Sequence, residues 1–99
     1  MGLFDAFSFK KEAQKIFNKE NFHMVLSTAR EAIVSFAKDN IPGIEKKKRV
    51  DEIVEIKIRE LTTSITNKLV LWVVERIIDI VPVITQLIYD FLKEKVENL

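Results

Sequence analysis

One apolar stretch, Leu69 to Leu92, constrains the fold of this chain more than any other feature, and it carries the only tryptophan and the only tyrosine. When residues 68 to 99 are placed on one helix at 100° per residue, nine of the polar side chains fall within a sector of roughly 100°. These polar residues are Lys68, Glu75, Arg76, Asp79, Gln86, Asp90, Lys93, Glu94 and Glu97. The remaining sector of about 260° is largely apolar, so this helix must be covered on several sides.

Pro82 interrupts the apolar stretch. A proline inside a helix removes one backbone hydrogen bond, here to the carbonyl of Ile78, and crowds the preceding turn. Pro82 falls beside the polar sector, where water can satisfy the freed carbonyl and a bend can wrap the helix around its neighbours. We therefore predict one long helix that is kinked at Pro82, with two helices that meet there as the alternative.

The apolar stretch is long enough to cross a bilayer, since roughly 20 residues suffice. However, Glu75, Arg76 and Asp79 would then lie near the bilayer centre, where each costs about 2.5 to 3.5 kcal/mol. A buried helix of a soluble protein is therefore favoured. The amino terminus lacks the basic and apolar segments of a cleavable signal peptide, and the chain has no cysteine, so we predict a cytoplasmic protein.

Two further helices are predicted in the first part of the chain. Ser8 can cap a helix that begins at Phe9. The apolar spacing of that helix loses its phase over residues 18–21, which indicates a break. Asn21 can then cap a second helix, whose apolar face runs from Phe22 to Ala37.

The middle of the chain predicts a turn, a third helix and a connection. Residues 40–44 contain Pro-Gly and form a predicted turn. The third helix follows over about 44–61, although the alternating apolar residues within 54–58 leave a short strand open. Residues 62–67 are rich in threonine and serine, which bond their own backbone, so the connection to the last helix is placed there.

The sequence thus predicts a single helical domain over residues 1–99, an all-α bundle of about four helices with a long, kinked C-terminal helix. At 1.5 Å per residue the last helix would reach roughly 45 Å and the second about 27 Å, so the last helix overhangs its partners. A second copy of the chain is the simplest cover, which predicts a homo-oligomer. The candidate interface residues are Trp72, Val73, Ile77, Ile80, Ile84, Ile88 and Phe91.

No pattern in the sequence indicates catalysis, a cofactor or a metal. The single histidine, His23, has no second histidine and no cysteine in the chain to share a metal ion with it. Gly2 and Gly43 are the only glycines, so a glycine-rich phosphate loop is excluded. We therefore predict a protein that is not an enzyme, with no cofactor and no metal.

Two other surfaces give alternative functions. The N-terminal apolar segment, residues 1–7, can act as a membrane wedge or pack over the bundle, through Leu3, Phe4 and Phe7. The single basic cluster offers possible anion contacts at Lys46, Lys47, Lys48 and Arg49. Acidic residues flank this cluster, and 16 basic residues nearly balance 15 acidic ones, which disfavours nucleic acid as a partner and favours a solvated surface.

A family resemblance rests on three runs of residues, which are Ala29-Arg30-Glu31-Ala32-Ile33, the turn Ile41-Pro42-Gly43 with Glu45-Lys46-Lys47-Lys48 and Val50, and Phe91-Leu92-Lys93-Glu94-Lys95-Val96. They resemble the soluble helical part of small bacteriophage holin-like proteins of the LL-H type, over residues 29–60 and the carboxyl end. This chain lacks the charge-free amino-terminal transmembrane helix of those proteins. The resemblance implies a phage or prophage origin, whereas the missing helix argues against lytic membrane action.

Together these features predict a non-enzymatic module for self-association or protein-protein interaction. The alternative is a peripheral membrane-binding protein that uses the N-terminal amphipathic segment.

Overall fold

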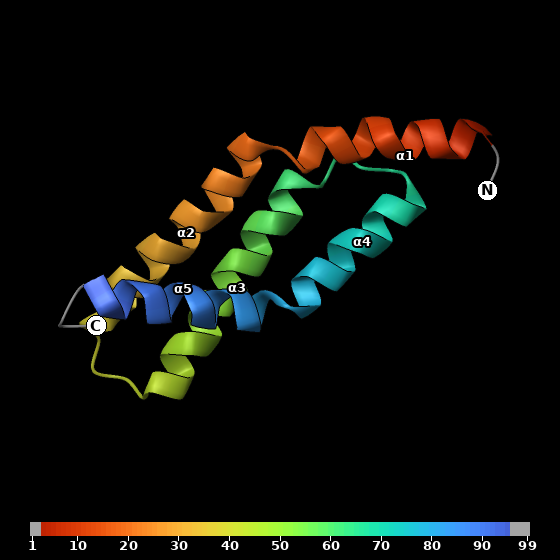
Figure 1. Ribbon diagram of the computed structural model, residues 1–99. Helices are drawn as coiled ribbons and strands as arrows, with labels where there is room; N and C mark the ends of the chain where they lie inside the picture. The colour runs from red at the N-terminus through yellow and green to blue at the C-terminus, as the bar shows by residue number, and fades with distance from the viewer. Residues whose placement is uncertain (1–2, 96–99) are drawn as a thin grey trace.

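The computed structural model describes the backbone of residues 3–95 and the side chains of residues 9–95 (Figure 1). The helices are α1 (Leu3–Ile16), α2 (Lys19–Ala37), α3 (Gly43–Leu61), α4 (Lys68–Asp79) and α5 (Val81–Lys95). Residues 3–95 form no strand, so the all-α prediction is confirmed and the short strand within 54–58 is wrong. Five helices replace the predicted four because the long C-terminal helix is divided.

The predicted kinked helix is two helices, α4 and α5, which meet at Ile80. The N–H of Ile80 donates to the carbonyl of Ile77 at 3.1 Å in a tight last turn, and this ends α4. Pro82 lies in the first turn of α5, where a backbone N–H has no partner within the helix, so the proline breaks no bond there. The chain changes direction at this point (Figure 1).

The first two helices begin at residues other than those predicted. The helix α1 begins at Leu3, so Ser8 lies inside it and does not cap it. Asn18 caps α2, because its side-chain oxygen accepts the N–H of Asn21 at 2.8 Å. Asn21, the predicted cap, instead donates a hydrogen bond from its side-chain amide to the carbonyl of Ile16 at 3.1 Å. This bond gives a partner to the last carbonyl group of α1. The predicted break between these helices is therefore confirmed, and the cap of α2 lies three residues earlier than predicted.

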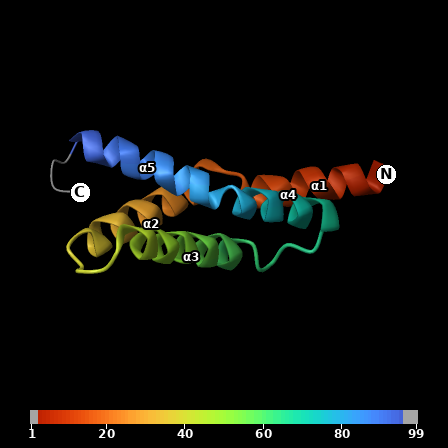
Figure 2. The same cartoon turned by 90° about the horizontal axis from the view of Figure 1, so that it is seen from below.

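The helices form two layers. In one layer α2 and α3 pack side by side as an antiparallel pair, and α5 lies across both in the other layer (Figure 2). The helix α4 continues from α5 toward the opposite end of the molecule, where it contacts α1 and α3.

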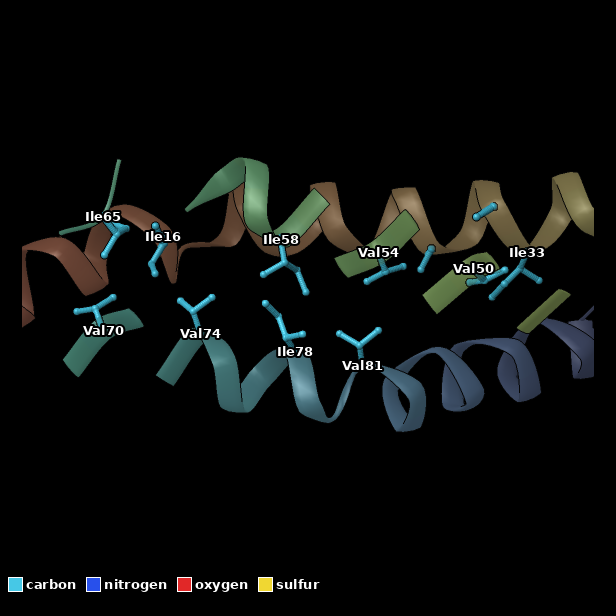
Figure 3. Packing of buried hydrophobic residues seen from close by; sticks show 12 residues of the cluster. Ile16, Ile33, Val50, Val54, Ile58, Ile65, Val70, Val74, Ile78 and Val81 are labelled. Carbon is cyan, nitrogen blue, oxygen red and sulfur yellow. The ribbon is translucent and has the colours of Figure 1, made fainter. Parts of the chain in front are cut away.

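The core is a narrow seam of valine, isoleucine and alanine between these layers (Figure 3). The side chains of Val70, Val74, Ile78 and Val81 point from α4 and α5 toward a facing row (Figure 3). That facing row comprises Ile16, Ile33, Val50, Val54, Ile58 and Ile65. No aromatic side chain among residues 9–95 is fully buried, so the largest apolar groups lie at the edges of the core or outside it.

The molecule is elongated, with extents of 52 × 22 × 18 Å and a radius of gyration of 15.8 Å. A compact chain of this length has a radius of gyration of about 12.6 Å. The solvent-accessible surface is 7320 Å². A folded monomer of this mass exposes about 5,800 Å², so this chain exposes roughly 1,500 Å² more than a compact protein.

A polar cluster fixes α5 on α3. The Lys47 ammonium group donates to the Asp51 carboxylate at 3.1 Å and to the carbonyl of Pro82 at 2.7 Å. The hydroxyl of Thr85, which is only 2% exposed, donates to Asp51 and accepts from Lys47 at 3.3 Å. A proline carbonyl and a buried hydroxyl thus gain charged partners from residues more than thirty positions away in the sequence.

Glu12 connects α1 to the start of α4. Its carboxylate accepts the backbone N–H of Asn67 at 2.6 Å and the hydroxyl of Thr66 at 3.1 Å. Desolvation alone raises the pKa of Glu12, but the hydrogen bonds from Asn67 and Thr66 together lower it below its usual range. The ionised carboxylate therefore favours the docked position of α1.

A surface ion pair also connects α3 to α4. Arg59 lies 2.8 Å from Glu75 on α4 and 3.0 Å from Glu55 on its own helix. The hydrogen bond from Arg59 holds the pKa of Glu75 below its usual value. All three groups are accessible to solvent, so salt screens this pair.

Candidate interface on helices α4 and α5

The predicted interface residues divide between the outer surface and the edge of the core. Trp72, Ile80 and Phe91 are 58%, 50% and 60% exposed. The other four, Val73, Ile77, Ile84 and Ile88, are half-buried, and Ile77 and Ile88 pack against the core. The structure thus places three of the seven on an open surface and turns the others partly inward.

The most exposed apolar side chains of α5 form one continuous line, here called the outer stripe. It consists of Val83, Leu87 and Phe91 of α5 together with Ile80, which immediately precedes this helix, and each is at least 50% exposed. Their spacing of three or four residues places them on one side of the helix. Val81 and Thr85 occupy the opposite side and are buried against α3.

Sequence reasoning missed Val83 and Leu87. Both residues lie within the wide apolar sector, but the sequence does not show which part of that sector faces the other helices. Only the position of α5 across α2 and α3 makes Ile88 inward and Leu87 outward.

On α4 the exposed surface continues toward Trp72. Trp72, Arg76 and Ile80 are spaced by four residues and therefore lie along one side of α4. The guanidinium group of Arg76 lies 5.6 Å from the centre of the Trp72 ring and forms an ion pair with Asp79 at 3.1 Å. An aromatic ring and a cation on α4 thus extend from the Ile80 end of the outer stripe.

An apolar groove of about 480 Å³ adjoins the outer stripe. Two candidate interface residues, Ile77 and Ile84, line it on the side of α4 and α5. The start of α2 contributes Phe22, which is 62% exposed, and the preceding turn contributes Phe17. The floor consists of core residues from α3, including Val54. Its almost wholly apolar lining fits an apolar side chain better than a polar ligand.

Three of the four predicted anion-contact residues have partners within the chain. Lys46 donates to the carbonyl of Ala37 at 3.1 Å, and Lys47 belongs to the polar cluster with Thr85. Arg49 pairs with Glu45 at 3.0 Å. Lys48 is exposed and, in the part of the chain that the structure describes, makes no hydrogen bond or ion pair.

A second groove, of about 590 Å³, lies where α2 and α3 meet the side of α5. Ile33, Phe36 and Tyr89 supply apolar walls, while Lys46 and Lys47 reach its edge. Because both lysines already donate to carbonyl groups, this groove is not an open cationic site.

The side chains of the predicted membrane wedge lie outside the described residues. The backbone of α1 includes Leu3, Phe4 and Phe7, but the structure does not describe their side chains. Within residues 3–95, no helix combines the length and the apolar character that crossing a membrane requires.

His23 is exposed at the start of α2, where its ring meets the Phe22 ring edge-on at 6.3 Å. Among the described residues, no three histidine, aspartate or glutamate side chains converge in a way that could hold a metal ion.

No protein-family model, curated protein or solved structure matches this chain. The fold and the exposed surface are therefore the basis for the function proposed below.

Proposed function

We propose that this protein is a non-enzymatic helical module that associates with a second copy of itself through the outer face of α4 and α5. The outer stripe carries this proposal. Each of its four apolar residues is at least 50% exposed to solvent. Continuous apolar patches of this kind are typical of protein-protein interfaces.

The surface area of the molecule supports a second copy as the partner. A standard interface removes about 800 Å² from each partner, and this elongated chain exposes roughly 1,500 Å² more than a compact monomer does. One interface of ordinary size is therefore enough to cover the outer stripe. Among residues 9–95 no aromatic side chain is deeply buried, so association would add apolar burial that this part of the monomer lacks.

The composition of the face fits an interface as well. Interface centres are enriched in aromatic residues and arginine, and Trp72 and Arg76 on α4 and Phe91 on α5 are all exposed. The Lys95 ammonium group lies over the Phe91 ring, 5.8 Å from its centre. Such an arrangement of an apolar centre and a charged rim resembles known interfaces.

Sedimentation equilibrium over low to high micromolar concentrations tests this proposal. The wild-type chain should form dimers, and Leu87→Ser should shift the population toward monomers because Leu87 is 64% exposed in the single chain. The matched control is Ile56→Ser on the outer side of α3, where the side chain is 58% exposed. This variant should associate like the wild type.

Two results would overturn the proposal. One is a wild-type chain that stays monomeric at all of these concentrations, and the other is equal weakening by Leu87→Ser and Ile56→Ser. Co-sedimentation of a monomeric chain with anionic vesicles would instead favour the peripheral membrane hypothesis.

A further inference from the structure

We propose that two copies pair antiparallel along α5, with Ile84 against Leu87 of the second copy and Ile80 against its Phe91. This inference rests on the proposed self-association and specifies its geometry. It follows from the spacing of the apolar residues along α5 and from the charges at the end of that helix.

The first argument is the spacing. Ile80, Ile84, Leu87 and Phe91 follow one another at intervals of four, three and four residues, which is the repeat of a coiled-coil contact line. On α5 they lie within roughly 60° of one another. The carbonyl of Ile80 accepts the N–H of Ile84 at 3.1 Å, so Ile80 stays in phase with the helix that follows. This line can pack against another helix at a shallow angle of about 20°.

The second argument is symmetry. The contact line alternates between positions that precede a three-residue step and positions that precede a four-residue step. In an antiparallel pair, positions of different kinds face each other, so Ile84 opposes Leu87 and Ile80 opposes Phe91. A single two-fold axis between Thr85 and Gln86 produces both contacts. Every member of the line then has an apolar partner, as an interface between identical copies requires.

The third argument is charge. The next position of the contact line after Phe91 is Glu94, which is exposed. A parallel pair would place Glu94 opposite Glu94 of the second copy, with two carboxylates repelling each other. The antiparallel pair places Glu94 beyond Ile80 of the second copy, toward the end of its α4, which carries Arg76. Opposed helix dipoles also favour the antiparallel direction.

This register also accounts for the apolar groove beside the outer stripe. Phe91 of one copy lies against Ile80 of the other, between Ile77 and Ile84, and those two residues line the groove. The aromatic ring therefore covers the groove opening, and the half-exposed Ile80 is buried at the same time.

Cysteine cross-linking tests the register. The native chain has no cysteine, so every disulfide must involve an introduced cysteine. A disulfide requires Cα atoms within about 7 Å. In the antiparallel pair Ile80 and Phe91 of different copies are adjacent, whereas two Phe91 positions are offset by about 17 Å along the helix. A mixture of Ile80→Cys and Phe91→Cys should therefore cross-link several-fold more than either variant alone.

Efficient cross-linking of Phe91→Cys with itself would overturn the antiparallel register, and so would an absence of cross-links in a mixture that sediments as dimers. A monomeric wild-type chain would instead overturn the proposed self-association, so the two failures are distinguishable.

Glu94→Gln supplies a second measurement that does not depend on cysteine. Removing this carboxylate should weaken antiparallel dimers by about 2- to 30-fold, because two pairs with Arg76 are lost. It should strengthen parallel dimers, where it relieves repulsion. Tighter association of Glu94→Gln would contradict our proposal.

Discussion

Replacing Thr85 with valine tests whether the polar cluster between α3 and α5 stabilises the fold. Valine has nearly the same shape as threonine but lacks the hydroxyl that donates to Asp51 and accepts from Lys47. A hydrogen bond to a charged group contributes about 1.5 to 3 kcal/mol. The Asp51 side chain is only 20% exposed, so water can replace the lost donor only in part. We expect Thr85→Val to reduce the free energy of unfolding by about 2 kcal/mol.

Urea unfolding followed by far-ultraviolet circular dichroism measures this change. Protein concentration must be the same for all variants, because self-association adds to apparent stability. In a thermal scan, 2 kcal/mol corresponds to a decrease in Tm of about 8 to 16 °C for a domain of this size. A double-mutant cycle with Asp51→Asn should show a coupling energy of at least about 0.5 kcal/mol.

The matched control is Thr63→Val. The Thr63 hydroxyl is exposed and donates to the carbonyl of Glu60 at 3.2 Å, so its loss should change stability by less than about 0.5 kcal/mol. A Thr85→Val variant as stable as the wild type, or more stable, would refute the reasoning. It would mean that desolvation of the buried charges offsets the bonds they form.

Three further predictions concern other contacts. Because the pKa of Glu12 is lowered, its carboxylate stabilises docked α1 above about pH 4, and this contribution is lost as pH falls through the folded-state pKa. The protection of the backbone amides of α1 against hydrogen exchange should fall over the same pH range. Glu12→Gln should abolish this pH dependence. Val54→Ala should cost about 2 kcal/mol in urea unfolding, because Val54 is 1% exposed, whereas Ile56→Ala should cost less than about 0.5 kcal/mol. Glu75→Gln should cause a small loss of stability that disappears in high salt, and a loss that persists would contradict a screened contact with Arg59.

Local signals explain why most helix ends could be predicted from the sequence. The Pro-Gly pair in residues 40–44 restricts the backbone before α3, and the threonines within 62–67 bond to nearby carbonyls, as Thr62 does to Ile58 at 2.9 Å. The connections therefore lie where the sequence placed them. Asn18 and Asn21 show the limit of such signals, since either residue can cap α2 and only the geometry of the α1 end selects between them.

Contacts between distant residues explain what the sequence did not show. Lys47 belongs to a charged run that is typical of a solvated surface, yet it reaches the carbonyl of Pro82, 35 residues away. The inward or outward direction of Leu87 and Ile88 likewise depends on where α2 and α3 lie. The exposed apolar residues lie on the helices that the sequence indicated, but the sequence did not show which side of α5 they occupy.

The carboxylate of Glu12 joins positions 55 residues apart, which has a consequence for the order of folding. Closing a loop of that length costs about 3.5 kcal/mol in chain entropy, against about 1.4 kcal/mol for the five-residue connection between α2 and α3. The pair α2 and α3 should therefore form first and α1 should dock late. At a synthesis rate of about 5 to 20 residues per second, α1 waits roughly 3 to 11 seconds for the ribosome to supply its partner, and a helix of its length is marginal in isolation. During that interval its apolar face is available to chaperones or to another nascent chain.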